Sequence, residues 1–233
     1  MADFSTRSSQ SELMDSLDPI PEPLLRQWAK ELSMVNRLLG GYRAVTAGLD
    51  RLTRDRSRRY SIVDYGCGGG GVLVAIAEWA RKRSLDVDLV GVDINPAIAD
   101  FTRRTCAAFP NISVVTGDVF TFGDQVHDIT TSTLFWHHFD DADLKRLITL
   151  MWERARLGVV VNDLHRHPLA FYGIRILTAL FSRSTFVKND GPISVLRAFK
   201  RAELVRLIED TPMSGATIEW RWAFRYLITA RKP

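Results

Sequence analysis

The stretch Ser61-Ile-Val-Asp64-Tyr-Gly66-Cys-Gly68-Gly-Gly70-Gly71 decides the fold, because a short apolar run ends there in a glycine-rich turn. Gly66, Gly68 and Gly71 match the spacing G-x-G-x-x-G. Glycines at such a turn let the backbone approach a ligand closely, and the helix that follows offers its N-terminal amides. The spacing alone fits a nicotinamide dinucleotide as well as other nucleotide-like cofactors.

Downstream of this loop, strand-like and helix-like segments alternate. Repeated strand, helix, strand units require parallel crossovers and place helices on both faces of a sheet. The link between the last two strands is too short for a parallel crossover, so the final strand should run antiparallel. The sequence therefore predicts a doubly wound α/β fold. We expect strands at residues 61–64, 87–93, 112–116, 127–134, 157–161, 216–220 and 224–230, and intervening helices at 72–83, 96–109, 140–153 and 200–209.

Segments outside this alternation suggest how the chain is organised. Residues 1–20 begin with a polar run and are expected to be a disordered N-terminus. Residues 21–59, with two helical repeats of apolar residues around Gly40-Gly41, are expected to form a helical cap over a cofactor-binding domain at 60–233. Residues 165–199 are expected to form a lid or substrate segment, with an apolar helix at Leu169–Phe181 and a polar turn at Lys188–Gly191. Core packing, a dimer interface or a membrane surface would also account for that apolar helix.

Three acidic residues follow three successive predicted strands. Asp64 precedes the first glycine and would repel a pyrophosphate, but it would attract a ligand ammonium group. Asp93 can accept hydrogen bonds from ribose hydroxyls, and Asp118 can accept one from an adenine amino group, with Val119 packing on the ring. Jointly with the glycine loop, these acids favour S-adenosylmethionine (SAM) over a dinucleotide.

The quoted residues resemble the motifs of class I SAM-dependent methyltransferases. Asp64-x-Gly66-x-Gly68-x-Gly70 resembles their first motif, Gly91-Val-Asp93 their second-strand motif and Gly117-Asp118 their adenine motif. The resemblance runs from about Ser61 to Pro233 and implies a Rossmann-like, seven-stranded sheet with an antiparallel last strand. It also implies that SAM is the cofactor and that Ile94 lies at its site. The segment 133–139 is similar to that of small-molecule enzymes of the quinone-biosynthesis type, which implies that Thr133 and Leu134 touch the methionine part of SAM. Enzymes that modify polyketide or phenolic natural products in secondary metabolism look similar.

Methyl transfer from a sulfonium mainly requires that the nucleophile be positioned and water excluded. A hydroxyl nucleophile benefits from a base, and four histidines fall near the ends of the fourth and fifth predicted strands. We expect His138 and His165 to be the catalytic candidates, because each lies where a strand passes into a loop. Asp163 could orient one of them or cap the next helix. No metal ligand is assigned.

Composition narrows the class of protein and its partners. The chain has 233 residues and 46% hydrophobic residues, enough for a single core. Two cysteines, no signal-peptide pattern and no long apolar run indicate a cytoplasmic protein without a membrane span. The formal charge is +4, with an arginine cluster at residues 51–59. That cluster lacks interleaved aromatic residues, so a nucleic-acid partner is not favoured. A homodimer is an alternative that the sequence neither favours nor excludes.

The favoured function is O-methylation of a small, aromatic or polyketide-like or quinone-like acceptor. Methylation of a ring carbon is the near alternative, since an activated phenol needs the same base. A second alternative is an enzyme acting on RNA or protein, but Thr133-Leu-Phe-Trp136 stands where amino-directed nucleic-acid enzymes carry Asn-Pro-Pro-Tyr. A SAM-binding protein without catalysis is a third alternative, and the intact acids and glycines give it no support.

Overall fold

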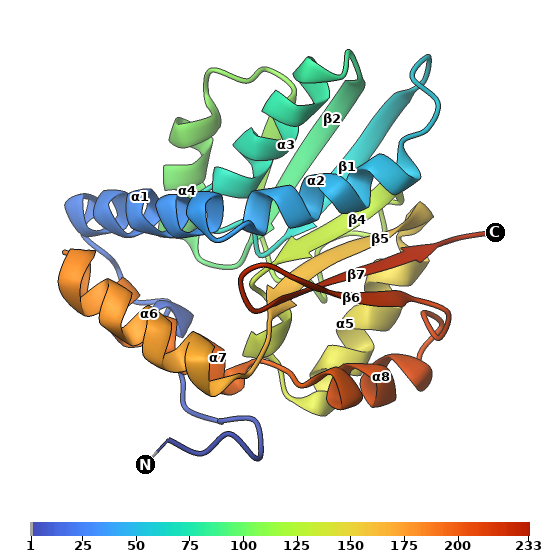
Figure 1. The fold of residues 1–233 in the computed structure, drawn as a ribbon. Coiled ribbons are helices and arrows are strands. Elements are labelled where there is room, and N and C mark those ends of the chain that lie inside the picture. Colours follow the sequence, from blue (N-terminus) through green and yellow to red (C-terminus); the bar gives the residue numbers. More distant parts are fainter. Residues whose placement is uncertain (1) are drawn as a thin grey trace.

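The computed structural model describes residues 2–233. Seven strands form one mixed sheet in the order β3-β2-β1-β4-β5-β7-β6, with helices on both faces (Figure 1). The first five strands are parallel, whereas β7 runs antiparallel to both β5 and β6. The predicted doubly wound sheet with an antiparallel last strand is therefore confirmed. The strands are β1 (Arg59–Tyr65), β2 (Asp86–Asp93), β3 (Ile112–Thr116), β4 (His127–Thr133), β5 (Ala155–Leu164), β6 (Thr217–Arg221) and β7 (Arg225–Arg231).

Two helical layers enclose the sheet. One face is covered by α2 (Gly41–Leu52), α3 (Gly71–Lys82) and α4 (Pro96–Cys106), and the other by α5 (Asp141–Glu153) and α8 (Arg201–Glu209). Every residue of β4 is buried, as expected for a central parallel strand with helices on both sides. The crossovers place the carboxyl ends of β1, β2, β4 and β5 along one edge, where the connecting loops gather.

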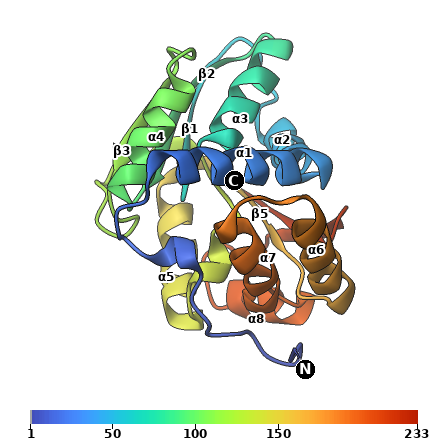
Figure 2. The same ribbon diagram turned by 90° about the vertical axis from the view of Figure 1, so that its left-hand side faces the viewer.

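Three more helices lie beyond that edge. They are α1 (Glu22–Leu38), α6 (Pro168–Phe181) and α7 (Thr185–Arg197), and Figure 2 shows α6 and α7 side by side below α1. Two short 3-10 helices, η1 (Leu13–Asp15) and η2 (Trp136–His138), lie nearby. The two predicted N-terminal helices are present, but they pack in different parts of the fold. Helix α2 packs on the face of the sheet, whereas Trp28 and Ala29 of α1 lie against the glycine loop. In the described part of the chain, no helix is both long and apolar enough to cross a bilayer.

The N-terminal segment differs from the disordered segment expected at residues 1–20, of which Met1 lies outside the described residues. Arg7 donates to the carbonyl oxygens of Arg197 and Phe139 at 2.9 and 2.7 Å. The backbone amides of Leu13 and Met14 donate to the carboxylate of Asp190. Polar residues order this segment through ionic and backbone contacts, which a search for apolar periodicity does not detect.

The polar turn expected at Lys188–Gly191 is wrong, because these residues lie inside α7. Ser184 caps this helix by accepting a hydrogen bond from the Val187 amide. Val187 and Ile193 bury their side chains on either side of the polar run. Tertiary packing therefore outweighs the low helix propensity of asparagine, glycine and proline here.

Candidate functional site

A cavity of about 860 Å³ lies at the carboxyl edge of the sheet. Its floor is the glycine loop and the ends of β2 and β4, and its walls come from α1, α6, α7 and residues 11–17. Open α/β sheets hold their ligands at such an edge. The cavity lies at the upper end of the usual size for small-molecule sites, roughly 300 to 1,000 Å³. It has room for a cofactor and a second molecule.

The glycine loop needs its glycines for backbone geometry. Gly66, Gly68 and Gly70 have φ values of +69°, +51° and +80°, a region that side chains disfavour. A side chain at Gly66 would also overlap the ring of Phe135. Gly66 and Gly68 line the cavity, whereas Gly70 caps α3 and does not. The loop is thus a preformed cradle that only glycines allow.

Asp93 connects this loop to the end of β2. Its carboxylate accepts hydrogen bonds from the backbone amides of Gly68 and Asn95, each at 3.0 Å. Burial raises the pKa of Asp93, and the two amide donors counteract that rise only in part. Asp93 and Ile94 both line the cavity. The carboxylate is therefore held rigidly, with acceptor capacity left for a ligand.

Asp64 lies one layer deeper than the sequence suggested. Its side chain is buried and does not line the cavity. One carboxylate oxygen accepts a 2.8 Å hydrogen bond from Thr131, and the other has no partner among the described residues. Burial raises the pKa of Asp64 to about 7. The structure thus places Asp64 beneath the loop, and its direct contact with a ligand stays a prediction.

The loop after β3 brings Asp118 and Val119 to the cavity wall. Asp118 accepts a 2.9 Å hydrogen bond from the Phe120 amide, which fixes the turn. Val119 is buried and contributes to the cavity lining. Both predicted adenine-site residues therefore face the same space as Asp93.

The end of β4 carries a strained residue. Leu134 has a φ of +55°, which is uncommon for a branched side chain and is found mostly where a site demands it. Thr133 and Leu134 both line the cavity, and the Thr133 hydroxyl is buried without a hydrogen-bond partner among residues 2–233. The neighbouring Asn162 side chain likewise has no partner for its amide. Buried polar atoms without partners are rare in native structures, so the Thr133 hydroxyl is available to a polar ligand in the cavity.

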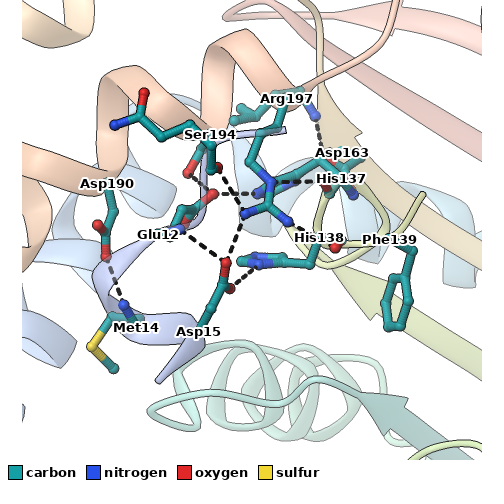
Figure 3. Close-up of polar contacts among 12 residues, drawn as sticks. Glu12, Met14, Asp15, His137, His138, Phe139, Asp163, Asp190, Ser194 and Arg197 are labelled. Carbon is teal, nitrogen blue, oxygen red and sulfur yellow. Dashed lines mark hydrogen bonds and ion pairs between the residues drawn. The ribbon is translucent and has the colours of Figure 1, made fainter. Parts of the chain in front are cut away.

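His138 lines the cavity and is held by a residue far away in sequence. Its Nδ1 lies 2.6 Å from a carboxylate oxygen of Asp15, at the end of η1 (Figure 3). Burial opposes ionisation of Asp15, but the hydrogen bond from His138 and the nearby charges of His138 and Arg197 hold its pKa well below the usual range. An ionised Asp15 fixes the Nδ1 proton on His138 and leaves Nε2 as the basic nitrogen.

His137 is a second, fully buried histidine that the sequence did not single out. Its Nδ1 lies 2.7 Å from Asp163, and its Nε2 lies 3.4 Å from Glu12 (Figure 3). Burial alone would lower the pKa of His137, but the two carboxylates outweigh it and raise the pKa to about 9. Glu12 also accepts a 2.8 Å hydrogen bond from Ser194. His137 is therefore an imidazolium that joins β5, the N-terminal segment and α7.

His165 does not belong to this group. It is not among the residues that line the cavity, and its ring packs against those of His167 and Tyr226. Burial, followed by the positive charges of His167 and Arg166, lowers its pKa. The sequence placed it at a strand end, but β5 is longer than predicted and its hydrogen bonding continues through the His165 amide, which donates to Phe224.

Sequence reasoning also missed Glu12, Asp15 and Arg197. Arg197 donates to Asp15 at 2.7 Å and to the carbonyl oxygens of His137 and His138 (Figure 3). Glu12 and Asp15 are three residues apart, so their carboxylates lie on the same side of one short turn, as in a helix. That spacing beside the apolar Leu13 and Met14 is the one signal in the sequence that this segment has a folded partner.

The titration of His137 leads to a prediction about stability. Its pKa is about 9 in the folded protein, against an ordinary histidine value of 6.5. The stabilisation of the folded state by protonated His137 is therefore complete below pH 6.5 and is lost as the pH rises through 9. Asp64 has a pKa of about 7 in the folded protein, so it changes the free energy of unfolding mainly below pH 7. We expect the free energy of unfolding to fall by about 2 kcal/mol between pH 7 and 9, as linkage requires.

Urea denaturation at several pH values checks this expectation. The His137→Gln variant is the control and should show a flat profile over the same interval. A wild-type profile that is equally flat would mean that His137 is neutral in the folded protein.

Comparisons with known proteins agree with this geometry. Residues 62–158, from β1 into β5, match the family model described as a methyltransferase domain. No curated protein sequence matches the chain. Among solved structures, magnesium protoporphyrin IX methyltransferase from Synechocystis PCC 6803, with bound S-adenosylhomocysteine (SAH), has a TM-score of 0.56 at 16% identity, over 84% of this chain and 83% of that one.

Two further structures show the same fold. Human N-acetylserotonin methyltransferase, in complex with SAM, has a TM-score of 0.63 at 17% identity, over 90% of this chain and 55% of that one. A putative O-methyltransferase from Nostoc punctiforme PCC 73102 has a TM-score of 0.60 at 15% identity, over 90% of this chain and 61% of that one. At these identities the likeness concerns the fold.

The sheet order, the antiparallel β7 and the glycine loop define the class I methyltransferase fold. Residues 62–158, somewhat less than half of the chain, match the methyltransferase domain, and the chain as a whole has the fold of the SAM-dependent methyltransferases that match it.

Proposed function

We propose that the chain methylates a small, apolar, aromatic acceptor on oxygen, with SAM bound in the cavity. The observation that carries the proposal is the set of carboxylates around the glycine loop, Asp64, Asp93 and Asp118. A pyrophosphate would be repelled there, whereas SAM has no phosphate and carries an ammonium group. When bound, SAM supplies an electrophilic methyl group on a sulfonium.

Each predicted contact has a partner of suitable chemistry. Asp93 would accept hydrogen bonds from the ribose hydroxyls, with Ile94 beside the adenine, and Asp118 would accept one from the adenine amino group above Val119. Thr133 and Leu134 would contact the methionine part. The unpaired oxygens of Asp64 and Thr133 fit this assignment, because each lacks a hydrogen-bond partner among the described residues. Gly66, Gly68 and Gly70 would keep the loop backbone close to the ligand.

The character of the acceptor follows from the remaining cavity wall. That wall is mainly apolar and aromatic, with Met14, Leu17, Phe135, Phe139, Leu169, Ile174, Leu177, Trp222 and Phe224. Such a surface favours an aromatic or lipophilic molecule over a nucleic acid or a polar peptide. Two of the matching structures are methyltransferases named for small molecules, magnesium protoporphyrin IX and N-acetylserotonin.

His138 would act as the base. Its Nε2 is free to take the proton of an acceptor hydroxyl, while Asp15 stabilises the imidazolium that results. Full deprotonation of a phenol by an ordinary imidazole before the transfer would cost about 5 kcal/mol, so the proton should leave in concert with methyl transfer. Methylation of an activated ring carbon would need the same base, and a carbon methyltransferase is among the matching structures.

Calorimetry tests the cofactor assignment. We expect SAM and SAH to bind with one site per chain and NAD not to bind. Asp93→Ala should weaken SAH binding by about 1 to 3 kcal/mol, because the ribose contacts are lost. Asp128→Ala, a change of a buried carboxylate at the other end of the sheet, is the control and should leave SAH affinity unchanged. Binding of NAD in place of SAH would overturn the proposal.

A further inference from the structure

The mouth of the cavity has an exposed apolar rim. Leu38 ends α1, Trp222 lies in the turn between β6 and β7, and Leu169 begins α6. These three positions are neighbours: the Ala223 amide donates to the Leu39 carbonyl, and the ring of Phe224 stacks on that of His167 at 4.9 Å. Leu38, Leu169 and Trp222 are each about two-thirds exposed, at 66%, 66% and 67%. Water therefore contacts large apolar side chains at the entrance of the site.

An apolar stripe on α6 extends this rim. Leu169, Tyr172, Ile176 and Leu180 recur at helical spacing on one side of the helix, and all are exposed. Phe181, the last residue of α6, is also exposed. With Met34 and Leu38 of α1 and with Trp222, these side chains make up what we call the mouth face. Large exposed apolar side chains at the mouth of a cavity mark a candidate site of interaction.

The charges in the two segments that carry most of the mouth face are predominantly positive. Residues 27–49 and 165–200 contain only two acidic side chains, Glu31 and Asp190, and both are buried and bonded to backbone amides. Five exposed cations in the same segments form no ion pair within residues 2–233; they are Lys30, Arg37, Arg175, Arg183 and Lys188. An apolar surface bordered by unpaired cations complements an anionic, partly apolar partner.

A second copy of the chain is a poor fit to this surface. In a twofold dimer the same patch meets itself, so the five cations would face each other without counter-charges. A bilayer that contains anionic lipids offers acyl chains to the apolar side chains and negatively charged headgroups to the cations. Tryptophan and tyrosine, present here as Trp222 and Tyr172, are also the residues enriched at the level of lipid headgroups.

We propose that the mouth face docks on the surface of an anionic lipid bilayer. The stripe on α6 lies in the plane of the headgroups with its side chains among the upper acyl groups, and the cations contact lipid phosphates. In this orientation the cavity opens toward the membrane, so a lipophilic acceptor can enter without crossing water. That route for the acceptor rests on the proposed function, whereas the docking itself rests only on the surface.

Co-sedimentation with vesicles tests the docking independently of activity. We expect the full chain to sediment with vesicles of equal parts phosphatidylglycerol and phosphatidylcholine. Binding to pure phosphatidylcholine should be much weaker, and added salt should reduce binding to the mixed vesicles. Two variants probe the two parts of the surface: Ile176→Ser with Leu180→Ser and Phe181→Ser, and Arg175→Glu with Arg183→Glu and Lys188→Glu. Each should lower the partition coefficient at least about tenfold.

A matched control carries the same change of charge at the opposite edge of the sheet. Arg54→Glu, Arg56→Glu and Arg81→Glu alter exposed cations near the amino ends of the strands, and this variant should bind mixed vesicles like the wild type. Binding of SAH to all variants shows that they are folded and separates failure of docking from failure of the proposed function.

Three results would overturn the proposal. One is no binding to mixed vesicles by a chain that binds SAH. Another is equal loss of binding in the control variant, which would mean general charge attraction. The third is a concentration-dependent dimer that the serine variant abolishes, with no vesicle binding, which would assign the mouth face to a second copy.

Discussion

Asp163→Ala should lower the free energy of unfolding by about 3 to 5 kcal/mol, the range observed when one partner of a buried ion pair is removed. Asp163 is fully buried and accepts hydrogen bonds from the His137 ring and from the Leu164 amide, both at 2.7 Å. Without it, the His137 imidazolium keeps only the 3.4 Å contact with Glu12. His137 must then lose its proton or remain a poorly compensated buried charge.

Urea denaturation near neutral pH measures this loss through the shift of the midpoint at constant slope. Glu22→Ala is the comparison, because it removes the exposed ion pair with Arg26 and should cost less than about 1 kcal/mol. Asp163→Asn separates charge from hydrogen bonding, since the amide can still bond the ring. If Asp163→Ala cost no more than Glu22→Ala, His137 would not be charged in the folded protein.

His138→Ala should lower turnover at saturating SAM by a factor of about 10² to 10⁴, the usual contribution of a general base. The change leaves the cofactor contacts untouched, so SAH affinity should stay the same. Turnover is measured as SAH release with a phenolic acceptor identified by screening. His165→Ala is the matched control, because that ring lies outside the cavity lining, and it should turn over like the wild type.

Asp15 is a positioning residue in the same scheme, and its variant separates support of the base from support of the fold. Asp15→Asn removes the negative charge beside His138 but retains a group that can accept the Nδ1 hydrogen bond. Without that charge the imidazolium formed during the transfer is less stabilised, so kcat should fall while the KM for the acceptor and the affinity for SAH stay the same. Loss of turnover in His165→Ala, with His138→Ala unaffected, would contradict the assignment of the base.

The sheet could be predicted because its signals are local. The glycine loop, the alternation of strands and helices, and the short link before Phe224 each depend on neighbouring residues. Asp93, Asp118 and Thr133 could be assigned to one space for the same reason, since the ends of parallel strands meet at one edge. These elements agree with the structure within a few residues at their boundaries.

The histidine network could not be predicted from local patterns. In Trp136-His137-His138 the sequence does not show which ring turns inward, because η2 interrupts the strand periodicity. His137 faces Asp163, whereas His138 faces the cavity and Asp15. Their partners Glu12 and Asp15 lie in a segment without apolar periodicity. Only the packing of residues 7–15 against α7 and η2 brings these charges together.

The contacts between Asp15, His138 and Arg197 have a consequence for how the enzyme folds. Asp15 lies 123 residues from His138 and 182 from Arg197 in the chain. Contacts at such separation require large loops to close, and they form late when they depend on elements that must fold first. During synthesis Asp15 leaves the ribosome long before Arg197, which donates a hydrogen bond to it. We therefore expect these contacts to form after the central sheet, since η1, η2 and α7 must all be in place first.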